Sequence, residues 1–260
     1  MPVTTLIFTN LAIMLGVMVA LWPISVWRKD PSYIDSVWPL GFIVMGVSTA
    51  LLTNQSLTAT SLVLGLTAIW GLRLGGHLFT RWLHEGPDKR YKALKAKAKF
   101  NPDLFVLIYV FLMQGVLLWL VSLPIQHAIA EGPKPLGPIG LAGLALFVTG
   151  FAFETIADWQ LTRFKADPAN AGQVMDRGLW RYTRHPNYFG DACVFWGIWV
   201  ISVADGTGWW TLIGPAFLTF TLVKWSGAAL LEKGMRKTRP GYADYILRTS
   251  GFVPWFPKRD

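Results

Sequence analysis

The sequence predicts an all-α integral membrane protein with seven transmembrane helices, an outer N-terminus and an inner C-terminus. Three observations lead to this class. Of the 260 residues, 53% are hydrophobic and only 15% are charged, whereas a soluble domain carries roughly 25% charged residues. Apolar segments near the ~20 residues that cross the hydrocarbon core recur along the chain. Basic residues gather in every second connection between these segments.

The seven apolar segments cover residues 5–27, 37–53, 57–83, 104–126, 136–163, 187–204 and 208–231. Helices are expected because an isolated strand cannot satisfy its backbone hydrogen bonds in lipid. Short turn-forming stretches separate several segments, as in Thr53-Asn54-Gln55 and Asp205-Gly206-Thr207. No long linker divides the chain, so a single domain over residues 1–260 is expected.

The basic residues predict the orientation of the segments. With an outer N-terminus, the inner connections are residues 28–36, 84–103, 164–186 and 232–260. All but three of the 24 Lys and Arg residues lie in or at the edge of these connections, which the positive-inside rule assigns to the cytoplasm. The net charge of +9 is attributed to this topology and to attraction by anionic lipid. Nucleic-acid binding is not expected, because the charge is spread over four loops without a binding motif.

Several familiar sites are missing from the sequence. The single cysteine, Cys193, excludes a disulfide framework and a multi-cysteine metal site, and we expect it to be a small buried residue. No metal site is expected. The chain contains no Rossmann glycine fingerprint, P-loop, zinc-protease motif or nucleophile elbow. A nucleotide site would therefore be built from membrane helices and inner loops.

The third segment carries a polar face. Arg73, His77 and Arg81 follow one another at spacings of four residues, which places them on one side of a helix. Arg73 lies about three turns from the helix end. An arginine at this depth is costly without a partner, so it forms either an interior salt bridge or the polar wall of a cavity that contacts an anion.

The fifth segment ends in a second polar face. Glu154, Asp158 and Lys165 fall nearly on one side of the helix. Carboxylates on adjacent turns repel unless they meet a cation or hydroxyl donors. The partner is either Arg73 or Lys224, or the diol of a ribose, whose hydroxyls donate to carboxylates.

The stretch 178–191 is the most informative of the chain. Pro186 suits the first turn of a helix, where its missing N–H costs nothing. Asn187 and Asp191 then lie one turn apart on that helix. Asn187 serves either as a cap or as a partner for a carboxamide, since both groups donate and accept. The preceding Arg181 and Arg184 would suit a phosphate, which guanidinium groups bind bidentately.

The C-terminal stretch from Glu232 onward contains Tyr242 and Tyr245. Their spacing fits a short amphipathic segment. This segment is either an anchor at the membrane interface or a lid of cations and phenols over phosphates and adenine.

Together these residues resemble the steroid 5α-reductase family in its bacterial branch, and more distantly the sterol C14/C7 reductases and the isoprenylcysteine carboxyl methyltransferases. The resemblance covers roughly residues 35–255. Its motifs are Trp70-Gly-Leu-Arg73, Glu154-x-x-x-Asp158-x-Gln160, Gly178-x-Trp180-x-x-x-Arg184-His185-Pro186-Asn187-Tyr188-x-Gly190-Asp191, Tyr242-x-x-Tyr245 and Phe252-x-Pro254. The Arg-His-Pro-Asn-Tyr core is specific to this superfamily but does not separate reductases from methyltransferases.

The resemblance implies a multi-pass reductase of the bacterial inner membrane that binds NADPH from the cytoplasm, with cytoplasmic loops capping the cofactor cavity. Asn187 and Asp191 would hold the nicotinamide carboxamide and the nearby ribose, and Lys165 would lie near the phosphates. The implied cofactor-binding residues are Glu154, Asp158, Arg163, Lys165, Tyr182, Arg184, His185, Asn187, Tyr188, Asp191, Glu232, Arg239, Tyr242 and Tyr245.

The implied reaction is hydride transfer to C5 of a 3-oxo-Δ4-steroid or a similar lipophilic enone. An acid must polarise the carbonyl oxygen, where negative charge develops. The family's acidic position matches Asp35, which would stay protonated at membrane depth because desolvation disfavours its charged form. The family's tyrosine position falls near Leu74, and Tyr33 is the candidate to replace it. The substrate-binding candidates are Trp38, Arg73 and His77.

Two other functions compete with this interpretation. A lipid- or thiol-directed methyltransferase that uses S-adenosylmethionine would share the Arg-His-Pro-Asn-Tyr region, but its cofactor lacks a pyrophosphate and needs fewer cations. A sterol or lipid binder without catalysis would tolerate loss of Asn187 or Asp158. The expected partners are the lipid bilayer and a steroid-like substrate, with no obligate protein partner.

Overall fold

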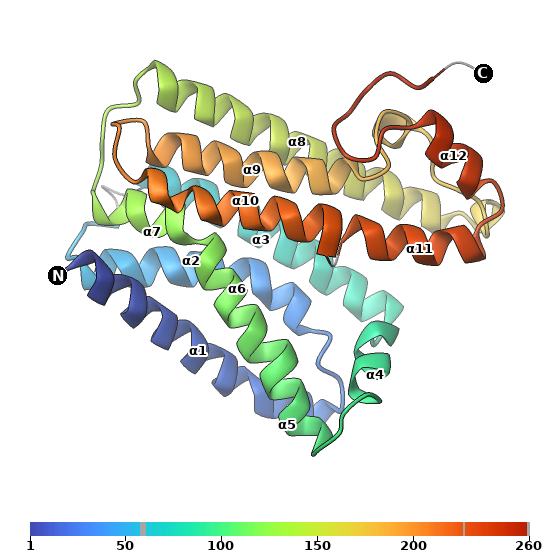
Figure 1. The fold of residues 1–260 in the computed structure, drawn as a ribbon, viewed down its shortest axis with the longest axis horizontal. Coiled ribbons are helices and arrows are strands. Elements are labelled where there is room, and N and C mark those ends of the chain that lie inside the picture. The colour runs from blue at the N-terminus through green and yellow to red at the C-terminus, as the bar shows by residue number, and fades with distance from the viewer. Residues whose placement is uncertain (58–60, 226, 259–260) are drawn as a thin grey trace. The chain divides into compact units, whose positions relative to one another are not determined.

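The computed structural model describes residues 1–57, 61–225 and 227–258 (Figure 1). Within these ranges the regular structure is helical, and a single isolated bridge joins Thr183 and Ser250. The chain divides into two compact units. Unit 1 comprises Met1–Pro135 and Gly206–Thr211, and unit 2 comprises Leu136–Asp205 and Leu212–Asp260. The all-α prediction is confirmed.

Six helices in the described part of the chain are long and apolar enough to cross a membrane, as expected of a multi-pass integral membrane protein. They are Val3–Arg28, Ile34–Leu52, Leu62–Glu85, Pro102–Val121, Pro138–Ala166 and Trp209–Thr238. The remaining predicted segment is helix α9 (Pro186–Ser202), which has 17 residues. That length lies at the lower limit for spanning the hydrocarbon core. The count of seven and the orientation stay predictions. Residues 58–60 and 226, which fall in two of the predicted segments, lie outside the described residues.

Unit 1 begins with three long helices and continues with shorter ones (Figure 1). Its elements are α1 (Val3–Arg28), α2 (Ile34–Leu52), α3 (Ser61–Glu85), α4 (Lys89–Lys95), α5 (Pro102–Val106), the π-helical η1 (Leu107–Leu112), α6 (Met113–Val121), α7 (Leu123–Ala130) and the first part of η4 (Trp209–Leu212). The predicted segment 104–126 matches one candidate span as far as Val121, but its last residues belong to a separate helix. A new helix begins at Leu123 with Pro124 in its first turn, because proline has no N–H for the preceding turn and its ring clashes there.

Helices α2 and α3 approach closely through glycine. A Cβ atom on Gly71 would lie 2.7 Å from the carbonyl oxygen of Pro39, and one on Gly75 would lie 3.0 Å from that of Ser36. Small residues four apart let two helix backbones approach each other in lipid. This approach fixes the start of α2, which carries the predicted acid Asp35.

A buried polar network joins three helices of unit 1. The side-chain amide of Asn10 on α1 donates to Thr49 Oγ1 at 2.8 Å and to Gln126 Oε1 at 2.9 Å. Ser48 in turn donates to Asn10 Oδ1 at 2.7 Å. Because every partner is satisfied within the unit, these polar groups fix the relative register of α1, α2 and α7.

Unit 2 is built on α8 and α9, which run side by side (Figure 1). Its elements are α8 (Pro138–Ala166), the 3-10 turns η2 (Pro168–Asn170) and η3 (Gly178–Arg181), α9 (Pro186–Ser202), α10 (Ile213–Phe220), the π-helical η5 (Thr221–Trp225), α11 (Ala228–Thr238) and α12 (Tyr242–Arg248). Helix α9 begins at Pro186 as predicted, and α12 confirms the short helix expected around the two tyrosines.

Four glycines form the contact between α8 and α9, and we call them the glycine seam: Gly143 and Gly150 on α8, and Gly190 and Gly197 on α9. On each helix the two glycines are seven residues apart, and therefore on one face. A Cβ atom on Gly190 would lie 2.5 Å from both the backbone nitrogen of Glu154 and the carbonyl oxygen of Gly150. The two backbones are thus in direct contact, which brings the polar end of α8 against the first turns of α9.

Candidate functional site

The end of the glycine seam holds four polar side chains, which we call the acid–amide cluster: Glu154 and Asp158 from α8, and Asn187 and Asp191 from α9. The three carboxylates are buried, with exposed fractions of 2%, 6% and 8% for Glu154, Asp158 and Asp191. Asn187 donates from Nδ2 to Asp158 Oδ1 at 3.2 Å. The residues that the resemblance implies around the nicotinamide therefore all lie within one unit.

The cluster has a defined chemical capacity. Asn187 is not the cap of α9, since His185 occupies that position. Its amide can donate and accept, and carboxylate oxygens accept hydrogen bonds from hydroxyls. Carboxylates within apolar membrane helices are costly and mark functional sites by default. A ligand with a carboxamide and a diol fits this set of donors and acceptors.

A second group of contacts holds the loop before α9. Arg184 donates from Nε to Glu232 Oε1 at 2.8 Å, and His185 Nε2 lies 3.0 Å from the same oxygen. Arg184 also donates from Nη1 to the carbonyl oxygen of Thr249 at 2.5 Å. Of the two guanidinium groups suggested for a phosphate, that of Arg184 is thus engaged by the protein itself. Tyr188 stacks on His185 with a centroid distance of 5.5 Å.

The C-terminal segment is fastened to the same loop. The backbone nitrogens of Arg184 and Trp255 donate to the carbonyl oxygens of Ser250 and Tyr182, each at 2.9 Å. Tyr245 donates its hydroxyl hydrogen bond to the carbonyl oxygen of Trp180. These hydrogen bonds hold α12 and the C-terminal segment against the loop before α9.

The two tyrosines of α12 face the interior of unit 2. Tyr242 and Tyr245 are 1% and 2% exposed, so both rings pack against the protein and neither is available as an exposed anchor. Burial, together with the nearby charge of Glu232, raises the pKa of Tyr242 to about 12. The Tyr242 hydroxyl oxygen has no hydrogen-bond partner among the described residues.

The remaining cofactor candidates lie at the surface of unit 2. Arg163 and Lys165 are exposed near the end of α8, and the Arg163 guanidinium lies 5.1 Å from the ring centroid of Trp159. Tyr182 is 37% exposed, and Arg239 directly follows α11.

Gln160, part of a motif noted in the sequence, has a positioning role. Its Oε1 accepts from the backbone nitrogen of Leu179 at 3.0 Å. Gly178 beside it has a φ of 60°, in the left-handed region that favours glycine. The loop that leads into α9 is therefore anchored on α8.

Unit 1 contains an acid with an unpredicted partner. Asp35 Oδ1 accepts a hydrogen bond of 2.5 Å from the Tyr91 hydroxyl, and its Oδ2 lies 3.4 Å from Arg90 Nη2. Gln114 donates from Nε2 to the Tyr91 oxygen at 3.0 Å, while its buried Oε1 has no partner among the described residues. No pattern in the sequence pointed to Tyr91, which lies 56 residues from Asp35 in the basic helix α4.

The surroundings of α4 determine the protonation of its tyrosine, Tyr91, and of the preceding Asp88. Burial, and then the charge of Asp35, raises the pKa of Tyr91 well above its ordinary value, so its hydroxyl stays protonated at neutral pH. Burial alone would raise the pKa of Asp88, but hydrogen bonds from Arg90 outweigh it and the pKa is lowered. Arg90 therefore carries a charge that lies between Asp88 and Asp35.

Tyr33, the predicted second catalytic group, points elsewhere. Its hydroxyl donates to the carbonyl oxygen of Leu21 at 2.6 Å. Burial, and then the charge of Asp30, raises the pKa of Tyr33 to about 12. The Tyr33 hydroxyl thus links the start of α2 to α1. The tyrosine that contacts Asp35 is Tyr91.

The substrate-binding candidates also lie in unit 1. Trp38 packs edge-on against Phe42 at 4.8 Å, and Phe42 packs edge-on against Trp70 at 5.5 Å. Arg73 and His77 are half-buried on α3. The catalytic and substrate candidates therefore all belong to unit 1, whereas the cofactor candidates all belong to unit 2. In the described residues no group of three or more His, Cys, Asp or Glu side chains could hold a metal ion.

Comparison with known proteins gives two relatives. The chain is 23% identical over 271 residues to an uncharacterised protein of Schizosaccharomyces pombe, a match that covers 90% of this chain and 75% of that protein. It is 30% identical over 165 residues to a Delta(14)-sterol reductase of Ascobolus immersus. This second match covers 56% of the chain and 36% of the reductase. No solved structure matches the chain.

A family model also matches most of the chain. The match runs over residues 21–249, and so includes the acid–amide cluster, the loop before α9 and the Asp35–Tyr91 pair. The chain belongs to the family described as "Protein of unknown function (DUF1295)".

Proposed function

We propose that the protein is an NADPH-dependent membrane reductase of a lipophilic enone, with the Δ4 double bond of a 3-oxo-Δ4-steroid as the substrate class. The acid–amide cluster is the observation that carries this proposal. Three buried carboxylates and an asparagine bonded to one of them lie on two apolar helices, where such groups are retained for function. The similarity to a protein named as a sterol reductase favours reduction over methyl transfer.

The cluster fits the nicotinamide end of the cofactor. The Asn187 amide complements a carboxamide, and the carboxylates of Glu154, Asp158 and Asp191 can accept from ribose hydroxyls. Arg163 and Lys165, exposed near the end of α8, would meet phosphates. Bound NADPH would supply the hydride, and the protein supplies placement and electrostatics.

We assign a positioning role to the contacts around Glu232. Arg184 and His185 both bind its carboxylate, which fixes the chain that leads into Asn187. A bidentate arginine–carboxylate pair restricts geometry as well as adding energy. These residues would therefore act on the cofactor through the position of α9.

We place the acid at Asp35 and Tyr91, with Tyr91 in the role for which Tyr33 was the candidate. When both groups are protonated, the Tyr91 hydroxyl donates its hydrogen bond to Asp35, and the proton of the Asp35 carboxyl group remains available for donation. The group that carries this second proton would donate a hydrogen bond to the ketone oxygen of the enone, where negative charge develops during reduction. Trp38, Arg73 and His77 remain the substrate-binding candidates.

We also infer the topology from the sequence. Helix α9 would be the seventh span, with the N-terminus outside and the C-terminus in the cytoplasm of a bacterial cell. Positive charge in the connections supports this orientation, and it would let NADPH reach unit 2 from the cytoplasmic side of the inner membrane.

The experiment is a turnover assay on the full chain in phosphatidylcholine nanodiscs. We expect NADPH consumption that depends on a 3-oxo-Δ4-steroid, and deuterium from labelled NADPH at C5 of the product. Asn187→Ala should abolish both signals. Absence of turnover with a panel of lipophilic enones, combined with methyl transfer from S-adenosylmethionine, would establish the methyltransferase alternative instead.

A further inference from the structure

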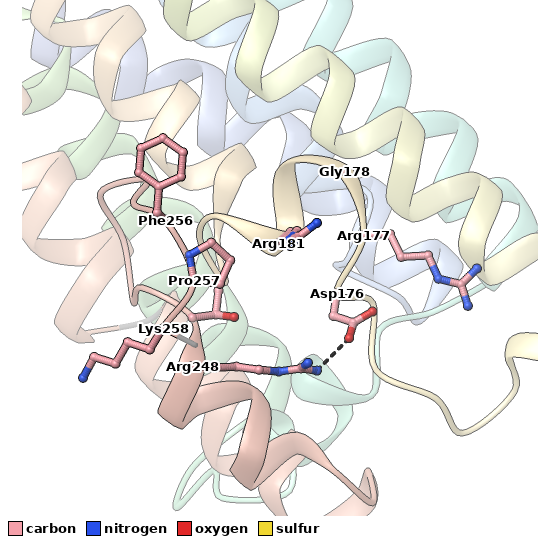
Figure 2. A pocket seen from close by; sticks show the side chains of 9 residues that line it. Asp176, Arg177, Gly178, Arg181, Arg248, Phe256, Pro257 and Lys258 are labelled. Carbon is pink, nitrogen blue, oxygen red and sulfur yellow. Dashed lines mark hydrogen bonds and ion pairs between the residues drawn. The ribbon is translucent and has the colours of Figure 1, made fainter. Parts of the chain in front are cut away.

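Unit 2 contains a cavity that the proposed function does not use, and we call it the basic pocket (Figure 2). It has a volume of about 810 Å³ and lies where the loop before α9 meets the C-terminal segment. Its lining residues are Asp176, Arg177, Gly178, Arg181, Arg248, Thr249, Phe256, Pro257 and Lys258. No member of the acid–amide cluster belongs to this lining.

The lining is strongly cationic. It holds four basic side chains and one carboxylate, a formal charge of +3. The carboxylate already forms an ion pair, in which Arg248 Nη2 lies 2.7 Å from Asp176 Oδ2 (Figure 2). The side chains of Arg177, Arg181 and Lys258 take part in no hydrogen bond or ion pair with other described residues. Grouped charges of one sign repel one another, and an anion in the pocket would offset this repulsion.

The backbone that carries these cations is fixed. Lys258 donates from its backbone nitrogen to the carbonyl oxygen of Arg248 at 3.0 Å, and Trp255 donates to Tyr182 at 2.9 Å. On the opposite wall, the bond from Leu179 to Gln160 anchors the turn that bears Arg177 and Arg181. A ligand would therefore have to order only the side chains, which lowers the entropic cost of binding.

The aromatic residues beside the pocket extend its chemistry. Trp255 and Phe256 are 72% and 77% exposed, although both belong to the fastened C-terminal segment. Aromatic side chains concentrate at the headgroup level of membranes, and clustered Lys and Arg attract acidic lipid headgroups. Guanidinium groups match phosphate oxygens bidentately.

We propose that the basic pocket is a phosphate-binding site of its own, occupied either by the headgroup of an acidic phospholipid or by a soluble phosphate ester. The recognition is the same for both sources: the guanidinium groups of Arg177 and Arg181 and the ammonium group of Lys258 would bind the phosphate. The one carboxylate in the lining, Asp176, is already paired with Arg248. The site is separate from the acid–amide cluster, so it stands whether or not that cluster binds NADPH.

The test measures binding to the full chain in the absence of dinucleotide. One arm titrates short-chain phosphatidic acid, with phosphatidylcholine of the same chain length as the reference. The other arm titrates inorganic pyrophosphate by calorimetry. The variant is Arg177→Gln/Arg181→Gln, and the matched control is Lys233→Gln/Lys237→Gln, which removes two exposed charges from α11 of the same unit.

We expect saturable binding of at least one probe, weakened by about tenfold or more in the arginine variant and nearly unchanged in the lysine control. Binding of phosphatidic acid alone would identify a lipid source, and binding of pyrophosphate alone a soluble one. The proposal is overturned if neither probe saturates, or if the two variants bind equally well. Asn187→Ala should keep this binding, which separates failure of the pocket from failure of the reductase proposal.

Discussion

Asp35 and Tyr91 share a hydrogen bond of 2.5 Å, and Gln114 donates a second one to the same hydroxyl. If this pair supplies the proton that polarises the ketone, Asp35→Asn and Tyr91→Phe should each lower kcat, by about 100-fold for the acid. The measurement is steady-state NADPH consumption with a saturating enone. Tyr109→Phe, which changes an exposed tyrosine of the same unit, is the control. Equal rates for Tyr91→Phe and Tyr109→Phe would remove Tyr91 from the chemistry.

The ionisation of Tyr91 predicts a pH dependence of stability. Its folded-state pKa is raised by burial and then by Asp35, so folding favours the neutral hydroxyl. The stabilisation is complete below the unfolded pKa of about 10 and is lost as the pH rises above it toward the folded value. The thermal midpoint of the wild type should therefore fall more steeply above about pH 10 than that of Tyr91→Phe. Parallel curves for the two proteins would contradict this account.

The sequence predicted the role of some of these residues and not of others. The family resemblance placed Asn187 and Asp158 in one pocket, whereas the residue pattern alone offered only Arg73, Lys224 or a ribose diol as partners of the Asp158 carboxylate. Tyr91 could not be predicted, since it lies in a basic connection and meets Asp35 only through the folding of α4. Tyr33 lay nearer to Asp35 in the sequence, yet its hydroxyl turns toward Leu21.

At the scale of elements, the glycine seam makes the acid–amide cluster possible. Gly190→Val should destabilise unit 2 by about 3 kcal/mol, because the new Cβ atom would meet backbone atoms of Glu154 and Gly150 at 2.5 Å. Gly234→Val on α11 is the control, since a Cβ atom there meets nothing within 4 Å. Thermal unfolding in detergent compares the two. A Gly190→Val protein as stable as the control would show that α8 and α9 do not approach as described.

The elements also show where a hydropathy pattern stops being informative. Apolar length correctly located α1, α2, α3 and α8 to within a few residues. It could not locate the π-helical turn η1 or the break at Ser122, because residues on both sides are equally apolar. The seam was also hidden, since glycine contributes no side chain to a pattern and its partner helix is known only after packing.

At the scale of the molecule, the division into two units is a matter of packing rather than composition. The sequence contains no long linker, and the residues Gly206–Thr211 belong to unit 1 although their neighbours on both sides belong to unit 2. The catalytic and cofactor candidates divide along the same line. The single reductase domain, the seven spans and their orientation therefore stay predictions that concern the whole chain.

The central claim is that the acid–amide cluster binds the nicotinamide end of NADPH. Titration of NADPH into the full chain in lipid nanodiscs, with S-adenosylmethionine titrated into the same preparation, tests it most directly. We predict saturable NADPH binding, none of S-adenosylmethionine, and at least about tenfold weaker NADPH binding for Asn187→Ala and Asp158→Asn. Binding of S-adenosylmethionine in place of NADPH, or NADPH affinities unchanged by both substitutions, would contradict the claim.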